Sequence, residues 1–257
     1  MPLTKIDIWP QRFTQNSASP RLFADLSETT FQTLLQNSFI KKFEPNTILI
    51  QQGDKPQHLF FIINGTLKTL RSNEEGGEAT MRMLQAGETC MEAVIFMGGP
   101  SPITVQAVLD TKILLIPENI VRTLALQDSQ FSHNLLLIVT HHYKNALQQI
   151  DAINIKTPLQ RVGYYLLAKH LEQGHTDLKF SLPFQKSLIA NYLGMTPETF
   201  SRALNKIKDL GINVDDDSIC MKDAFVLCHF CDSDTEALCD HSNKKDCPHC
   251  PIHNMCN

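Results

Sequence analysis

The sequence predicts an α+β fold in which a small antiparallel β-domain is followed by a long helix, a winged helix-turn-helix and a cysteine-rich tail. Three observations support this prediction. Short β-rich segments separated by turn residues fill positions 39–116, and helical periodicity returns after Pro117. Two helices joined by a turn at Gly194 then follow, and all but one of the eight cysteines lie beyond that turn.

The composition predicts a globular, cytoplasmic protein. With 257 residues, 42% of them hydrophobic and 19% charged, the chain is long enough for two domains. Its longest apolar run, Leu135 to Val139, is much shorter than the roughly 18 residues of a transmembrane helix, and the N-terminus lacks a signal-peptide core. We therefore expect no membrane partner, and we expect the clustered cysteines to bind metal or undergo redox chemistry. The net charge of -4 still permits a local basic surface.

The first part of the chain divides into an arm and a β-domain. Residues 1–20 are rich in Ser, Gln, Asn and Pro, which predicts a flexible arm. In the β-domain, assigned to residues 21–127, Ser27 is placed to cap an entry helix. The strands that follow predict a small antiparallel barrel or sandwich. Asn64-Gly65 predicts a two-residue hairpin turn, and Gly76-Gly77 marks another turn.

A long helix is predicted from about Ser129 to Asn154, within residues 128–155. Apolar residues recur along it at alternating three- and four-residue steps, which is a heptad pattern. Such a stripe can pack on the helix's own domain, but its length without a proline favours the interface of a homodimer. The predicted dimerisation residues are Leu136, Val139, Tyr143, Ala146, Ile150 and Ile153.

The helix-turn-helix is predicted from consistent local signals. A helix from Gln185 to Leu193 ends at Gly194, and Thr196 caps a second helix that has Pro197 at its first position. An apolar stripe on the second helix faces inward, and its polar face suits the major groove of double-stranded DNA. A merely solvated face is the alternative. The predicted DNA-binding residues are Thr196, Glu198, Ser201, Arg202, Asn205 and Lys206.

The order of these elements resembles the CRP/FNR family of bacterial transcription regulators across roughly residues 21–226. The segment "GINVDDDSICMKD" predicts the two strands of a β-wing, and "FFIINGTLK" and "LGMTPETFSRALNKIKDLGI" carry the resemblance most specifically. It implies an N-terminal β-roll like a cyclic-nucleotide-binding domain and a winged helix-turn-helix at residues 156–226. It also implies a non-enzymatic, homodimeric regulator that contacts RNA polymerase if it is an activator. Glu198, Ser201 and Arg202 are similar to the E-x-x-S-R set with which the FNR branch reads TTGAT-type half-sites.

The sensor chemistry of the family is only partly matched. Members that bind cyclic AMP carry a Gly-Glu-Leu element followed by an Arg-Ser pair; here Glu92 matches the ribose-binding acid, but no arginine lies between Arg82 and Arg122. A buried cyclic phosphate would lack its guanidinium partner, so we expect no cyclic AMP binding. The FNR branch usually senses oxygen through N-terminal cysteines, yet no cysteine precedes Cys90, which is expected to be an inert core residue.

The tail, residues 227–257, is the predicted sensor. Cys239, Cys247, Cys250 and Cys256 have the spacing C-x7-C-x2-C-x5-C, which resembles the 4Fe-4S loop of endonuclease III with one residue more in the first gap. Four thiolates suit an iron-sulfur cluster, and zinc is the main alternative. Cys228 and Cys231 form a further C-x2-C pair, similar to the start of the C-terminal cluster in some FNR relatives. This resemblance leaves open a second ligand set, Cys228, Cys231 and Cys239 with a non-cysteine ligand such as Asp151. We expect a cluster that senses oxygen, nitric oxide or redox state.

Two other functions remain open at this stage. In the first, the metal of the tail is structural and the β-roll binds haem or a small-molecule effector; His58, His133, His141 and His142 are available for haem, although helical histidines more often pack or lie at the surface. In the second, the tail belongs to a DNA-repair glycosylase. No helix-hairpin-helix or catalytic element of that repair family is visible in the sequence.

Overall fold

The computed structural model describes residues 20–172, 179–182, 184–215, 218–221 and 224–231. The chain forms two compact units that divide between Ala146 and Leu147, so that the division falls within one helix. The predicted arm before Pro20 and the predicted cluster ligands Cys239, Cys247, Cys250 and Cys256 lie outside the described residues. Within the described ranges, no helix combines the length and apolar character needed to cross a membrane.

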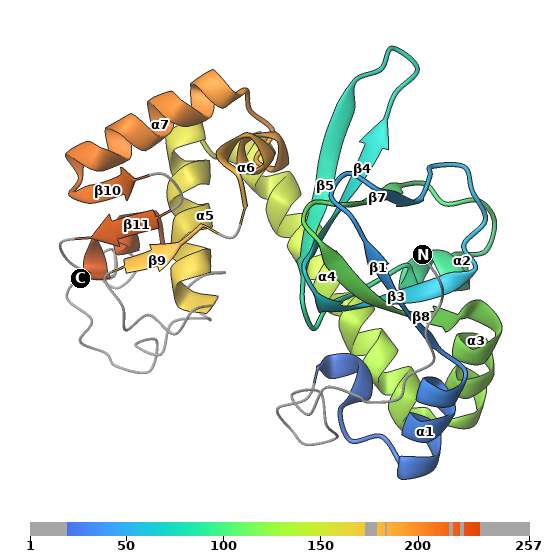
Figure 1. Cartoon of the computed structure of the whole chain (residues 1–257). Coiled ribbons are helices and arrows are strands. Elements are labelled where there is room, and N and C mark those ends of the chain that lie inside the picture. Colours follow the sequence, from blue (N-terminus) through green and yellow to red (C-terminus); the bar gives the residue numbers. More distant parts are fainter. Residues whose placement is uncertain (1–19, 173–178, 183, 216–217, 222–223, 232–257) are drawn as a thin grey trace. The chain divides into compact units, whose positions relative to one another are not determined.

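The first unit is built around two four-stranded antiparallel sheets, which confirms the predicted β-domain (Figure 1). Large apolar side chains such as Phe61, Leu67 and Ile113 are fully buried in one continuous core. One sheet has the order β1 (Phe39–Phe43), β8 (Thr111–Pro117), β3 (His58–Asn64) and β6 (Thr89–Cys90). The other has the order β2 (Ile48–Ile50), β7 (Thr104–Ala107), β4 (Thr66–Ser72) and β5 (Glu78–Gln85).

The hairpin predicted at Asn64-Gly65 is wrong. Strands β3 and β4 flank this dipeptide but belong to different sheets, so the chain turns a corner between sheets here. Gly65 has the positive φ that was expected, +94°, and a Cβ at this position would lie 2.5 Å from the carbonyl oxygen of Asp110. The Gly76-Gly77 turn is confirmed, because it joins the paired strands β4 and β5.

Among the described residues, five helical segments complete the first unit or begin in it. They are η2 (Arg21–Phe23), α1 (Glu28–Gln36), α2 (Glu92–Met97), α3 (Glu118–Gln127) and α4 (Ser129–Ile155). Ser27 caps α1 as predicted, since its hydroxyl accepts a hydrogen bond from the backbone N–H of Thr30 at 3.2 Å. Near its start, α4 buries Phe131, Leu135 and Ile138 in the core of the β-roll. The short α2 was not predicted from the sequence.

The second unit contains the predicted helix-turn-helix and wing. Its elements are α5 (Pro158–Glu172), β9 (Lys179–Ser181), α6 (Lys186–Tyr192), α7 (Pro197–Asp209), β10 (Ile212–Asp215), β11 (Ser218–Met221) and η3 (Ala224–Phe230). The wing strands β10 and β11 pair antiparallel, and β9 adds a third strand beside β11 that the sequence did not predict. Helix α5 packs against α7, as Figure 1 shows.

The corner at Gly65 makes a prediction with a matched control. Gly53 has a similar φ of +96°, but a Cβ there meets nothing within 4 Å. Gly53→Ala should therefore cost only the strain of a positive φ, about 1–2 kcal/mol. Gly65→Ala should cost about 1–3 kcal/mol more, because the added methyl also collides with Asp110 and Thr111. Urea unfolding measures the free energy of unfolding of both variants. Equal losses of stability would contradict the close approach of the backbone at Gly65.

Candidate DNA-binding surface and a buried charge cluster

The helix-turn-helix is shaped by its turn and its cap. Gly194 lies between α6 and α7 with a φ of +64°, and the Thr196 hydroxyl accepts a hydrogen bond from the backbone N–H of Thr199 at 3.3 Å. Arg161 of α5 donates to the carbonyl oxygen of Leu193 at 2.8 Å, which fixes the end of α6. The predicted inward stripe of α7 is confirmed, since all four of its residues are buried. They are Phe200, Ala203, Leu204 and Ile207.

The opposite face of α7 is exposed and polar. The six residues predicted to bind DNA are all exposed on this helix or at its cap: Thr196, Glu198, Ser201, Arg202, Asn205 and Lys206. A hydrogen bond from Thr196 holds the pKa of Glu198 below its usual value, and the charge of Arg202 adds to this effect. Glu198 is therefore a carboxylate at neutral pH. The face presents a hydrogen-bond acceptor and a guanidinium donor, which is the chemistry that base edges require.

An apolar stripe runs along the exposed side of α4. Among the predicted dimerisation residues, Leu136 is 63% exposed, Tyr143 64% and Ile150 55%. Ile153 and Ala146 are also exposed, whereas Val139 is half-buried. Apolar side chains exposed in this number along one helix are unusual on a monomer.

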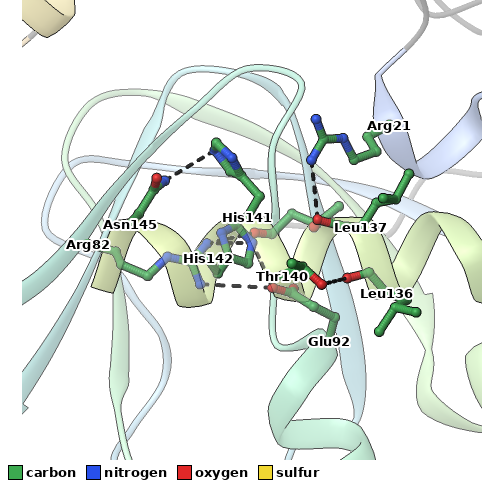
Figure 2. Close-up of polar contacts among 10 residues, drawn as sticks. Arg21, Arg82, Glu92, Leu136, Leu137, Thr140, His141, His142 and Asn145 are labelled. Carbon is green, nitrogen blue, oxygen red and sulfur yellow. Dashed lines mark hydrogen bonds and ion pairs between the residues drawn. The ribbon is translucent and has the colours of Figure 1, made fainter. Parts of the chain in front are cut away.

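A buried carboxylate lies where the β-roll meets α4 (Figure 2). Glu92, at the start of α2, is 1% exposed. One of its oxygens, Oε1, lies 2.9 Å from Nε2 of His142 on α4 and 3.9 Å from Nη1 of Arg82 on β5. Burial alone would raise the pKa of Glu92, but the hydrogen bond and charge of His142 and the charge of Arg82 outweigh burial and hold that pKa below its usual value.

One proton of this cluster is assigned from its charges. His142 Nε2 also lies 2.8 Å from Nη2 of Arg82, which is itself only a donor. A nitrogen that accepted from Arg82 would face the ionised Glu92 with a lone pair, which is repulsive. We therefore assign the Nε2 proton to the bond with Glu92, and Arg82 contributes its charge together with a long bond to the carbonyl oxygen of Thr89 at 3.5 Å.

The charge cluster consists of Glu92, His142 and Arg82. Its acid, Glu92, is the residue that matches the ribose-binding acid of the family. Glu92 Oε1 is taken up by His142 and Arg82 of the same chain. The next arginine, Arg122, is committed as well: it donates to Glu118 at 2.8 Å and to the carbonyl oxygen of Ile95. The other oxygen of Glu92, Oε2, is buried and has no hydrogen-bond partner among the described residues.

The other candidate ligands are placed as follows. Cys90 is fully buried, and burial raises the pKa of its thiol to about 12, which agrees with an inert core residue. Among the haem candidates, the rings of His141 and His142 on α4 lie 6.0 Å apart, and His142 is held by Glu92. His58 is on β3, and His133 is exposed on α4. Cys228 and Cys231 are half-buried. Within the described ranges, no group of three or more His, Cys, Asp or Glu side chains is arranged to hold a metal ion.

Comparison with known proteins identifies both units. The model of the cyclic nucleotide-binding domain matches residues 40–128, and the model of the Crp-like helix-turn-helix domain matches residues 160–230. The anaerobic regulatory protein of Pasteurella multocida is 27% identical over 176 residues, 67% of this chain and 64% of that protein. The cyclic AMP receptor protein of Thermus thermophilus is 27% identical over 164 residues, 64% of this chain and 74% of that protein.

A solved structure has the same fold. FixK2 from Bradyrhizobium japonicum superposes with a TM-score of 0.68 at 18% identity, covering 76% of this chain and 98% of that one. The predicted fold class, an α+β protein with an N-terminal antiparallel β-domain, a long helix and a C-terminal helix-turn-helix, is thereby confirmed.

The charge cluster gives a prediction about stability and pH. His142→Ala should lower the free energy of unfolding at neutral pH by about 1–3 kcal/mol, because it leaves a buried carboxylate without its hydrogen bond. His133→Ala, at an exposed position on the same helix, should change it by less than about 0.5 kcal/mol.

The effect of His142→Ala should depend on pH. The folded-state pKa of Glu92 is below its usual value, so the stabilisation by His142 is fully present above about 4.5, the usual pKa of Glu, and is lost as the pH falls through the lower folded-state pKa. Urea unfolding at several pH values measures the gap between wild type and His142→Ala. A gap that stayed constant down to the acid limit of folding would show that Glu92 is not ionised in the pair.

Proposed function

Because this chain belongs to the CRP/FNR family of transcription regulators, we propose that it is a homodimer that reads TTGAT-type half-sites and responds to oxygen, nitric oxide or redox state through an iron-sulfur cluster in its cysteine tail. The family regulates transcription and is not enzymatic, so a repair glycosylase is excluded. If the protein activates transcription, RNA polymerase is its further partner.

The exposed face of α7 is the observation that carries the DNA-binding part of the proposal. Glu198, Ser201 and Arg202 stand together near the start of the helix, which is the end that a helix-turn-helix places against base edges. Arg202 would donate to guanine O6 and N7, and Glu198 would accept from cytosine N4. Lys206, one turn farther along, would lie near the phosphate backbone.

The exposed stripe of α4 supports the dimer. Two copies related by a twofold axis would bury Leu136, Tyr143 and Ile150 against each other, as a heptad pattern requires. Such a dimer presents two copies of α7, and a palindromic site with half-sites about one helical turn apart would match them.

The described part of the cysteine segment fits a thiolate-bound group. The backbone N–H of Cys231 donates to the carbonyl oxygen of Cys228 at 3.0 Å, which closes a 3₁₀-type turn. Side chains three residues apart in such a turn lie on the same face, so the two thiols can serve one metal centre. A 4Fe-4S cluster takes four ligands, so either Cys239, Cys247, Cys250 and Cys256 supply all four, or some of them complete a set with Cys228 and Cys231. A bound 4Fe-4S cluster supplies an oxygen- and nitric oxide-reactive group at this place; zinc in the same ligands would be structural.

A second candidate keeps the metal structural and places an effector in the β-roll. A groove beside β1 and β2 offers a site for it. Three lysines line this groove, Lys41, Lys42 and Lys55, together with two acids, Glu44 and Asp54. Cyclic AMP is not proposed as that molecule, because no arginine lies between Arg82 and Arg122 to pair with its phosphate.

Substitution of the recognition arginine tests the DNA-reading face. Arg202→Ala should weaken operator binding by about 1–3 kcal/mol and should relax the preference at one base pair of each half-site. Lys208→Ala, also exposed on α7, is the matched control and should weaken all sequences about equally. Fluorescence anisotropy with single-base operator variants measures both. Unchanged base discrimination in Arg202→Ala would remove this residue from the reading face.

The metal assignment is tested by purification without oxygen. We expect about four iron and four sulfide ions per protomer and a broad visible absorption, both lost on exposure to air. Cys250→Ser should lose iron, whereas Cys220→Ser, at an exposed thiol on the wing strand β11, should keep it. Colourless protein with about one zinc ion would contradict the cluster and favour the structural metal.

A further inference from the structure

Segment η3, which follows the wing, is docked on helix α5 through one aromatic ring. Phe230 lies against Gly163, and a Cβ built on Gly163 would come within 2.3 Å of the Phe230 ring. Leu227, one turn earlier in η3, is fully buried. The two elements are in direct contact, so the segment that carries Cys228 and Cys231 is attached to the DNA-binding unit.

Gly163 has no backbone reason to be glycine. It lies inside α5, and its φ is outside the left-handed range. Glycine is unfavourable in a helix interior compared with alanine, because it loses more backbone freedom on folding. Because Gly163 has no side chain, the Phe230 ring can pack directly against the backbone of α5. This contact explains why a glycine occurs at this position.

Helix α5 joins this contact to the recognition helix. It packs directly against α7, whose inward stripe includes Phe200 and Ile207. It also holds α6, because Arg161 donates to the carbonyl oxygen of Leu193 and the ring of Tyr165 lies 6.3 Å from that of Tyr192. A displacement of η3 therefore acts on a helix that contacts both parts of the helix-turn-helix.

We propose that the contact between Phe230 and Gly163 is the mechanical link through which the state of the cysteine segment changes the position of α7. This inference rests on the proposed function for the regulatory signal, but the link itself is a property of the described residues. Phe230 and Gly163 are positioning residues: they touch neither DNA nor metal, and they determine whether a change at Cys228 and Cys231 reaches α5.

The link is tested first in the full-length protein without any signal. Phe230→Ala and Gly163→Ala should each raise amide hydrogen exchange in α7 and speed alkylation of Cys228 and Cys231, by about tenfold, as resolved by peptide mass spectrometry. In the Phe230→Ala background, adding Gly163→Ala should not raise exchange further, since the collision needs the ring and alanine favours the helix. Ala168→Gly, elsewhere on α5, is the control for altered helix propensity. Unchanged exchange in α7 would overturn the inference, whether or not the protein responds to oxygen.

The second test measures how strongly a change at the cysteine segment affects operator affinity. Operator affinity is compared before and after air in wild type and in the variants, with iron content determined in parallel. We expect the wild-type affinity ratio to fall to within about twofold of unity in Gly163→Ala while iron is retained. A variant that keeps both its iron and the wild-type ratio contradicts the link. Wild type that loses its cluster with no change in affinity refutes the proposed function instead, and the exchange experiment then decides the link alone.

Discussion

Helix α4 has two apolar faces, and only one of them is buried in the β-roll. The core of the first unit, the exposed apolar stripe and the contact with α6 all depend on this helix. Phe131, Leu135 and Ile138 occupy the core of the first unit. The exposed stripe through Leu136, Tyr143 and Ile150 lies on another side of the same helix. At its end, Gln149 donates to the carbonyl oxygen of Tyr192 at 2.9 Å and so contacts the helix-turn-helix. A single helix thus supplies core packing, the proposed dimerisation surface and an attachment for α6.

The same helix also supplies the hydrogen-bond partner of the buried acid in the β-roll. His142 brings a proton donor to the buried Glu92, and without such a partner a carboxylate that is 1% exposed would not stay ionised. The arrangement ties α2, β5 and α4 together through charges of one chain. The charges of His142 and Arg82 thus allow a buried acid to stay ionised in a domain similar to cyclic nucleotide-binding domains.

The sequence predicted those parts in which local signals agree. Thr196, Pro197 and the apolar stripe of α7 all indicate the same helix, and the exposed face followed from its period. The hairpin predicted at Asn64-Gly65 was wrong because a dipeptide that allows a positive φ suits a corner between sheets as well as a hairpin turn. Strand β9 is three residues long and pairs with a partner far along the chain, so nothing local marks it. The bond between Glu92 and His142 and the contact of Phe230 with Gly163 join residues 50 and 67 positions apart, and only the folded chain shows why those residue types occur there.

The central claim is that DNA binding follows the state of the cysteine tail. It is tested most directly by adding air stepwise to one anaerobic sample and measuring the visible absorption of the cluster and the operator affinity at every step. Our account predicts that the affinity changes in proportion to the cluster lost, and that it does not change in a sample of Cys250→Ser treated in the same way. An affinity that stays constant while the absorption disappears would contradict it.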